Sequence, residues 1–518
     1  MKKKFLLLIA ACTAIIPTAL AYSFSVVVPS GQRLYFNTFS NNTVAVTSEN
    51  TDYPYYSTTT EPTGHLVIPA TVAYNGTIYN VTWITHSAFY KCRYLNSVTI
   101  PNSVTSIGND VFRGCTRLAS VTIGSGVSSI GERAFYDCSG LTSVTIGGSV
   151  TTIGNYAFYG CSSLTSITIS DGVTSIGYGA FSGCSALTSV TIGGSVTSIG
   201  NGAFRGCSSL TSVTIPGVSS IGIEAFYHCT SLSNVTIGNS VTSIGDRAFD
   251  SCINITNITI PSSVTEIGSY AFINCTNLET LNYNAIFCGG GGFIINGSET
   301  LYVGTWLYHC TRLSTVIIGE NVRFIPWGIF AHRTGITSIT IPDSVIGIGS
   351  YAFYGCRGLT SVTIGSSVDT MGIGHAAFQN CSSLTSITVY AELPPTLGDN
   401  VFNEVPSNIN VYVPCGKQPL YLASWTHFSN FIEMCNSSID DVNALSANVY
   451  SVQGRIVVES GNGGPLGEVR VCDMMGRSLA TCGVSAEGTN RYSFYVPATG
   501  TYFVKIGNLP ARKVVVIR

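Results

Sequence analysis

Charged side chains are scarce in this chain of 518 residues. Asp, Glu, Lys and Arg make up 10% of the sequence, against roughly 25% in ordinary globular proteins, and the formal net charge is only −2. A chain without a basic surplus lacks the electrostatic attraction by which proteins bind nucleic acid or anionic lipid. We therefore expect no nucleic-acid partner.

Catalytic and metal-binding patterns are also lacking. The seven histidines do not form one column in the repeat described below, and no cysteines occur at the C-x-x-C spacing of many metal sites. No glycine-rich phosphate loop follows a strand, and no motif supports a Ser, His and Asp triad. The sequence predicts no enzyme, no metal site and no cofactor.

Long apolar runs are absent after the N-terminus, since no later stretch approaches the roughly 20 residues of a transmembrane helix. Residues 1–21, MKKKFLLLIAACTAIIPTALA, have a basic start, an apolar middle and a small-x-small ending, which are typical of a secretory signal peptide. We predict cleavage after Ala21, and the alternative is a lipoprotein box, IAAC, that ends at Cys12. Either prediction implies an exported protein without a transmembrane segment.

What the sequence has in abundance is an internal repeat. A phenylalanine three residues before a cysteine recurs every 23 residues, with one interval of 22, and the series resumes after an irregular stretch to give 14 units. The residues that mark the units are Phe89, Phe112, Phe135, Phe158, Phe181, Phe204, Phe226, Phe249, Phe272, Leu307, Phe330, Phe353, Phe378 and Phe402.

Each unit has three parts. The LTSVTI segment, residues 141–146 in one unit, predicts a strand with Val144 and Ile146 inward, because β-branched residues alternate there. The VTSIG segment, residues 173–177, predicts a second short extended piece that glycine ends. The AFxxC segment, residues 180–184, has apolar residues one and three positions apart, which suits a single helical turn.

One unit cannot bury enough apolar surface to fold alone, so we expect the units to stack with parallel strands about 4.8 Å apart. The AFxxCxxLxSVTIP pattern with this period resembles the BspA-like leucine-rich repeats of bacterial surface proteins, over about residues 82–434. The resemblance implies an α/β leucine-rich-repeat solenoid of short strands and short helical turns, with regular repeats over residues 82–390. The pattern departs at Arg333, at Pro326 and in the loop near Cys288, which puts regular stacking around residues 283–300 in doubt.

A column of cysteines occupies the same place in successive units. Stacked side chains that leave the core in parallel do not suit the C–S–S–C dihedral near ±90° of a disulfide, and a nucleophile would need a paired base. We predict that this column fills space in the core, with occasional bridges as the alternative. Cys161→Ser should then cost more than Cys161→Ala, because it buries a hydroxyl without a guaranteed partner. The column consists of Cys92, Cys115, Cys138, Cys161, Cys184, Cys207, Cys229, Cys252, Cys275, Cys310, Cys356 and Cys381.

Both ends of the solenoid depart from the repeat. Residues 22–81 contain alternating segments and an Asn75-Gly76 turn, which predict a small β cap; the YPYY cluster within it is interpreted as a partly packed loop, with a sticky patch as the alternative. Residues 391–435 predict a terminal repeat and cap, because an uncapped solenoid would expose an apolar face. Two cysteine pairs, Cys415 with Cys435 and Cys472 with Cys482, remain open as disulfides.

A polar linker is expected at residues 436–445, and alternating segments in residues 446–518 predict an antiparallel β-sandwich. The segments VRVCDMMGR, PATGTYFVKIG and RKVVVIR resemble the C-terminal sorting domain of the type IX secretion system. That resemblance implies recognition by the type IX secretion machinery, removal of the domain and a covalent surface anchor; an immunoglobulin-like adhesive module is the alternative. The secretion-signal residues it implies are Gly476, Pro497, Gly500, Tyr502, Lys513, Val514 and Val515.

The outward strand positions are almost uniformly Thr and Ser, as at Thr142, Thr165 and Thr188. A face of such uniform residues offers little basis for ligand specificity. Variation falls around the phenylalanine instead, where Tyr and Arg recur. We predict a protein secreted across the outer membrane to the cell surface, an adhesin that binds an extracellular protein or glycan by multivalent contacts. The alternative is a structural spacer or surface-layer protein without a specific ligand. The predicted binding residues are Tyr136, Tyr159, Arg205 and Tyr227.

Overall fold

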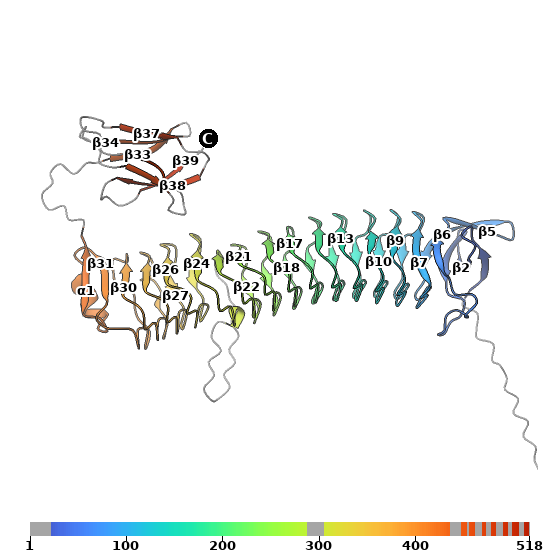
Figure 1. Ribbon diagram of the computed structural model, residues 1–518, viewed down its shortest axis with the longest axis horizontal. Coiled ribbons are helices and arrows are strands. Elements are labelled where there is room, and N and C mark those ends of the chain that lie inside the picture. The colour runs from blue at the N-terminus through green and yellow to red at the C-terminus, as the bar shows by residue number, and fades with distance from the viewer. Residues whose placement is uncertain are drawn as a thin grey trace, which may run out of the picture. The chain divides into compact units, whose positions relative to one another are not determined.

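The computed structural model describes residues 22–286, residues 305–435 and seven strands between residues 447 and 516. By its internal contacts the chain divides into two units, Met1–Met434 and Cys435–Arg518. The first unit is a parallel-strand solenoid in which each repeat makes one coil, and successive coils stack side by side (Figure 1).

Each regular coil contributes two strands, because two segments of its repeat alternate apolar and polar residues. In the longer strand β13 (Ser166–Ile169), Ile167 and Ile169 are buried, and Ser166 and Thr168 are exposed. The other long strands are β7 (Leu95–Ile100), β9 (Ser120–Ile123), β11 (Ser143–Thr145), β15 (Ser189–Ile192), β17 (Ser212–Ile215), β19 (Asn234–Ile237), β21 (Asn257–Ile260), β23 (Thr280–Tyr283), β24 (Thr315–Ile318), β26 (Ser338–Ile341), β28 (Ser361–Ile364) and β30 (Ser386–Val389).

The shorter strands come from the VTSIG segments and turn a single isoleucine inward. They are β8 (Ser106–Ile107), β10 (Ser129–Ile130), β12 (Thr152–Ile153), β14 (Ser175–Ile176), β16 (Ser198–Ile199), β18 (Ser220–Ile221), β20 (Ser243–Ile244), β22 (Glu266–Ile267), β25 (Phe324–Ile325), β27 (Gly347–Ile348) and β29 (Gly372–Ile373). From β8 to β22 they form one unbroken parallel ladder, whereas the long strands are divided among several sheets. The register advances by one repeat at each step, as in Ser166↔Ser189.

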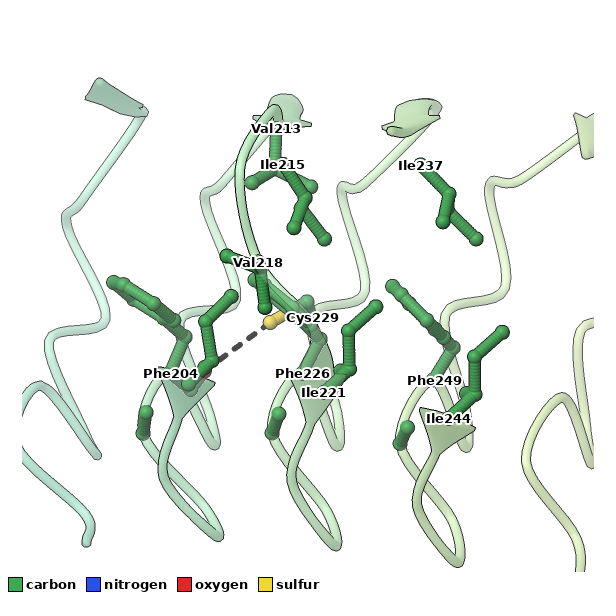
Figure 2. Close-up of a cluster of buried hydrophobic side chains, with 14 of the residues drawn as sticks. Phe204, Val213, Ile215, Val218, Ile221, Phe226, Cys229, Ile237, Ile244 and Phe249 are labelled. Atoms are coloured by element: carbon green, nitrogen blue, oxygen red, sulfur yellow. Dashed lines mark hydrogen bonds between the residues drawn. The ribbon is translucent and has the colours of Figure 1, made fainter. Parts of the chain in front are cut away.

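The core is a column of stacked phenylalanine rings flanked by isoleucine, valine and cysteine, all of them buried. From Phe89 to Phe272 the ring centroids of neighbouring coils are 5.0 to 5.3 Å apart and the rings are nearly parallel. Figure 2 shows three of these rings, Phe204, Phe226 and Phe249, at the same height in successive coils. Each coil thus shares its apolar layer with both neighbours, which explains why the repeats stabilise one another.

The predicted helical turn at the AFxxC segment is wrong. Around Phe135 the backbone alternates between two kinds of hydrogen bond: the N–H of Phe135 donates to Ala157 of the next coil at 2.7 Å, and the N–H of Tyr136 donates to Arg133 of the same coil at 3.1 Å. Arg133 and Asp137 are left-handed, with φ of 52° and 54°. A helix needs consecutive right-handed residues, so a left-handed residue two positions before and two after the phenylalanine makes linked tight turns instead.

Glycine ends most of the VTSIG segments because neighbouring coils approach each other closely there, and Pro326 takes its place in one coil. A Cβ placed on Gly154 would lie 2.7 Å from the backbone nitrogen of Glu132 in the preceding coil. Most of the later glycines of this column are equally crowded by backbone. A side chain at this position would push successive coils apart, so the small residue sets the stacking distance.

The ladder of long strands continues past the irregular stretch. β23 pairs directly with β24, with Thr280 opposite Thr315, and a short 3₁₀ helix, η1 (Thr305–Leu307), precedes β24. Cys288 lies outside the described residues. Arg333 stands in the cysteine column with only 7% of its surface exposed, and its guanidinium donates to the carbonyl oxygen of Leu307 at 3.0 Å.

Residues before the first repeat form strands that extend two of the sheets. β1 (Phe24–Val27), β2 (Arg33–Phe39), β3 (Thr43–Thr47), β5 (Thr71–Tyr74) and β6 (Thr77–Ile84) continue the ladder of short strands, and β4 (Gly64–Val67) pairs with β7. The predicted Asn75-Gly76 hairpin is confirmed, since both residues are left-handed and β5 pairs with β6. In the YPYY cluster Tyr56 is buried and donates to the carbonyl oxygen of Ala88 at 2.6 Å, whereas Tyr53 is 61% exposed.

The other end of the solenoid carries β31 (Asn410–Pro414), α1 (Gln418–Ser424) and β32 (Asn430–Met434). Trp425 is fully buried, packs 5.3 Å from the ring of Phe402 and donates to the carbonyl oxygen of Pro395 at 3.0 Å. Tyr421 and Phe428 are buried beside it. Cys415 and Cys435 are both disulfide-bonded, with their sulfur atoms within 4.8 Å of each other.

The second unit contains two antiparallel sheets. One joins β33 (Ala447–Val452), β34 (Arg455–Ser460) and β37 (Arg491–Tyr495); the other joins β36 (Ser478–Cys482), β35 (Val469–Cys472), β38 (Gly500–Ile506) and β39 (Arg512–Val516). Cys472 is a free thiol, so the pair Cys472 and Cys482 is not bridged. The expected linker at residues 436–445 lies outside the described residues.

Candidate functional site

The four predicted binding residues stand one position after the phenylalanine of their coils, and the structure arranges them as two pairs. The rings of Tyr136 and Tyr159 stack with centroids 4.7 Å apart and 10° between their planes. The guanidinium carbon of Arg205 lies 4.6 Å from the ring centroid of Tyr227. Ser182 occupies the same position in the coil between the two pairs, so they do not form one continuous row.

Aromatic and cationic side chains continue along the same edge of the solenoid. We call it the aromatic edge. It consists of the side chains that stand two and three positions before each column phenylalanine and one and two positions after it. Arg113 lies over the ring of Tyr136 at 4.8 Å and over Tyr90 at 5.8 Å. Farther along, Arg247 lies 5.6 Å from the ring of Tyr270. Cation–π contacts of this length contribute about 0.5–1 kcal/mol at exposed sites, so the edge is a chain of modest contacts.

The backbone beneath the aromatic edge is left-handed at two positions in every regular coil. Glycine is the residue that adopts this conformation without cost, and it occurs in some coils, as at Gly160 and Gly183. Other coils carry large side chains there, among them Tyr156, Arg247 and Tyr351, with φ between 52° and 58°. No Val, Ile or Thr is left-handed in the described repeats, because β-branched residues are the least compatible with this conformation.

A hollow of about 500 Å³ lies between the two pairs of predicted residues. It forms where three small residues, Ser182, Gly179 and Gly202, interrupt the large side chains of the edge. Tyr159 and Arg205 stand on its two sides, and the hollow is also lined by Tyr156, Tyr178, Asn201, Ile223 and Glu224. The structure therefore brings two of the four predicted residues to one concave site, while Tyr136 and Tyr227 stack behind them.

The charges beside the hollow are paired. Arg205 forms an ion pair with Glu224 of the next coil, in addition to its contact with Tyr227. Asn201 accepts the backbone N–H of Ile223 at 2.9 Å through its Oδ1, which holds the side chain and leaves its NH₂ group as a donor. Next to the hollow, burial and the nearby Asp137 raise the pKa of the Tyr136 hydroxyl.

The face formed by the outward strand positions, the hydroxyl face, is exposed as predicted, and one of its columns makes internal hydrogen bonds. Thr142, Thr165 and Thr188 each donate from Oγ1 to a backbone carbonyl of the preceding coil, at 3.0, 3.4 and 3.0 Å. A second ladder of hydroxyls in the VTSIG segments does the same, as from Thr174 to Thr151 at 3.2 Å. These threonines stitch neighbouring coils together, which gives their uniformity a structural reason.

The cysteine column contains free, buried thiols, as predicted for a packing role. Eleven of these thiols, the nine from Cys115 to Cys310 together with Cys356 and Cys381, also donate to a column carbonyl of the preceding coil. Figure 2 shows the bond from Cys229 to Phe204. Burial raises the pKa of these thiols, to about 12 for Cys184. A thiol that resists ionisation is a poor nucleophile.

Among the described residues, one cluster of metal-ligating types occurs, formed by Cys415, Glu433 and Cys435. Both cysteines are disulfide-bonded, so their sulfurs are not available as thiolate ligands. Within the same described part of the chain, no helix has the length and apolar character needed to cross a membrane.

The residues assigned to export are only partly described. Gly500 and Tyr502 lie on β38 and Lys513, Val514 and Val515 on β39, where Tyr502 pairs with Val514. Tyr502 is buried. Ala21, Gly476 and Pro497 lie outside the described residues.

Eight of the ten residues that line the hollow were not predicted from the sequence. Tyr156 stands two positions before the column phenylalanine of its coil, and Tyr178 stands three positions before that of the next coil. Glu224 stands two positions before Phe226. The available signal was the variation of these columns from coil to coil, together with the glycines at positions 179 and 202. Whether these residues line a hollow depends on the size of the side chains at the equivalent positions of the adjacent coils.

The repeat region of this chain matches a known family model, and solved structures of similar sequence exist. The sequence profile of the BspA type leucine-rich repeat region matches in six copies over residues 82–211, 197–287 and 303–427. A leucine-rich repeat protein from Bacteroides ovatus is 26% identical over 80% of this chain and 100% of its own, with a TM-score of 0.49. A leucine rich cell surface protein from Faecalibacterium prausnitzii is 30% identical over 71% of this chain and 94% of its own, with a TM-score of 0.40.

No curated protein has a significant match to the chain. The repeat profile covers more than half of the sequence, and it indicates no catalytic family. The chain belongs to the BspA-type leucine-rich repeat family of bacterial proteins.

Proposed function

We propose that this protein is an exported cell-surface adhesin that binds a macromolecule of a host or neighbouring cell through the aromatic edge. The observation that carries the proposal is the gathering of Tyr and Arg at variable positions along one exposed edge of a rigid stack. These residue types dominate the binding energy of protein interfaces. Contacts repeated from coil to coil favour multivalent attachment to a long ligand.

The left-handed backbone adds support. A non-glycine residue in this conformation costs about 1–2 kcal/mol relative to its right-handed form, and glycine occupies the same position in other coils. Tyr156, Arg247 and Tyr270 stand there despite that cost. Strained positions that keep large side chains are a basis for a functional hypothesis.

Three features support a surface location. Residues 1–21 have the pattern of a secretory signal cleaved after Ala21, one relative is described as a cell surface protein, and residues 441–518 resemble a type IX sorting domain. We propose that β39 (Arg512–Val516) belongs to the export signal, and that the strands of residues 22–81 cap the first coil. Deleting Lys513–Arg518 should leave the protein in the periplasm, detected by fractionation and surface proteolysis. Normal surface levels of the truncated protein would refute the sorting assignment.

The binding proposal is tested on the full chain with the quadruple variant Tyr136→Ser, Tyr159→Ser, Arg205→Ser and Tyr227→Ser. We expect binding to immobilised epithelial cells and extracellular-matrix proteins to fall to background, because each lost contact is modest but all act together. Circular dichroism and thermal unfolding establish that the stack stays folded.

The matched control is the triple variant Thr142→Ser, Thr165→Ser and Thr188→Ser, which keeps every hydroxyl donor of the hydroxyl face. Binding by the control should equal that of the wild type. If the control loses binding and the quadruple variant keeps it, the ligand uses the hydroxyl face. If the wild type binds neither the cells nor the matrix proteins, the alternative function, a structural spacer without a specific ligand, is the better supported one.

A further inference from the structure

We infer that the hollow between Tyr159 and Arg205 is a subsite for a neutral sugar ring, such as one hexose unit of a glycan chain. The inference rests on the proposed adhesive function and names a ligand class for one place on the aromatic edge. Nothing in the repeat pattern itself requires a hollow there, because the neighbouring coils fill the same position with large side chains.

The hollow is produced by a local loss of side chains. Tyr136, Tyr159, Arg205 and Tyr227 occupy the position one after the phenylalanine, and the coil between them has Ser182. Two positions before the phenylalanine, Gly179 and Gly202 replace the large residues of other coils. A Cβ on Gly202 would find only Arg205 Cβ, at 3.9 Å, so the space is open. A volume of about 500 Å³ falls within the roughly 300–1,000 Å³ of small-ligand sites.

Three tyrosine rings form one wall of the hollow. Tyr156 meets Tyr159 with ring centroids 5.9 Å apart at 72°, and Tyr178 with centroids 5.0 Å apart at 64°. The ring of Tyr156 lies against Gly179, since a Cβ there would be 2.8 Å from Tyr156 Cδ1. Tyr178 is 48% exposed and Tyr156 and Tyr159 are half-buried, while the hydroxyl groups of Tyr156 and Tyr178 interact with each other. Electron-rich ring faces suit the C–H groups of a pyranose, and the hydroxyls suit its polar rim.

The charges of the hollow favour a neutral ligand over an anion. Arg205 is already paired with Glu224 and stacked on Tyr227, so a phosphate or sulfate would have to displace Glu224 to reach it. The paired guanidinium and carboxylate, with the NH₂ group of Asn201, offer donors and acceptors without net charge. A ligand with many hydroxyl groups can use both kinds of partner.

The test titrates the full-length protein with short neutral oligosaccharides of glucose, mannose, galactose and N-acetylglucosamine, and with sulfated heparin oligosaccharides. Binding is followed by calorimetry and by ligand-observed NMR. We expect at least one neutral oligosaccharide to bind, and the variant Ser182→Tyr to weaken that binding by about tenfold or more, because the new ring continues the tyrosine stack into the hollow.

The matched control is Gln379→Tyr, which adds the same ring at the same position of a distant coil. It should bind sugar like the wild type, and thermal unfolding checks both variants. If Ser182→Tyr does not fold, the double variant Tyr159→Ala and Tyr178→Ala replaces it, with the same expected loss.

The inference is overturned if no neutral oligosaccharide binds, if binding is unchanged when the hollow is filled, or if only the sulfated oligosaccharides bind. The adhesion assay separates this failure from that of the proposed function. Cell or matrix binding that is lost in the quadruple variant, without any sugar binding, would leave the adhesin standing and remove the sugar subsite.

Discussion

Cys161 combines packing with a hydrogen bond, and this changes what its replacement should do. Its thiol donates to the carbonyl oxygen of Phe135 at 3.2 Å. Arg333, which stands in the same column, donates to the equivalent carbonyl of Leu307, so a donor is used at this position even when its chemistry changes. A serine hydroxyl at position 161 has the same acceptor, the carbonyl oxygen of Phe135.

The expected order of the two substitutions is therefore reversed from the sequence-based one. Cys161→Ala should lower the free energy of unfolding by about 1–2 kcal/mol through lost contacts. Cys161→Ser should cost less, because it keeps the donor for Phe135. Urea denaturation of the two variants measures both values, and a larger cost for serine would show that the acceptor is out of its reach.

The turns that carry the aromatic edge depend on left-handed residues, and Glu404 allows this to be tested away from the hollow. It is exposed, with φ of 61°, at the position where five other coils have glycine. Glu404→Gly should leave the free energy of unfolding within about 1 kcal/mol of the wild type, because relief of the left-handed strain offsets the greater freedom of the unfolded chain.

Glu404→Val makes the opposite change, since a β-branched residue is the least suited to a left-handed backbone. It should be less stable than Glu404→Gly by about 2 kcal/mol, again measured by urea denaturation. Equal stability of the two variants would mean that the turn is not left-handed in solution.

For the whole solenoid, the column of buried thiols predicts instability in alkali. Burial raises the pKa of all twelve column cysteines above the ordinary value of 9.0. Below that pH both folded and unfolded chains keep their thiol protons. Above it the unfolded chain releases protons that the folded chain holds, so stability falls as pH rises.

Each such thiol lowers the free energy of unfolding by about 1.4 kcal/mol per pH unit between its unfolded and folded pKa. The thermal unfolding midpoint should therefore drop steeply above about pH 9, and Cys161→Ala should make that drop shallower. A midpoint that stays level from neutral pH into this range would show that the thiols are accessible to solvent in the folded protein.

The sequence by itself determined the features that repeat. The period, the number of coils, the inward isoleucines and the packing role of Cys161 all follow from residue types at constant spacing, because a stacked unit must bury the same side every time. The Asn75-Gly76 hairpin also follows from local conformational preference. The sequence pattern is sufficient to predict a contact wherever a residue packs against its own equivalent in the next coil.

Only the tertiary structure decided the features that arise between unlike neighbours. The spacing of Phe181 and Cys184 suits a helical turn as well as linked turns, and the choice was made by hydrogen bonds to the next coil. The acceptor for each thiol and the pairing of Arg205 with Glu224 depend on the adjacent coil in the same way. The hollow at Ser182 exists because neighbouring coils carry large side chains at the height where this coil has none.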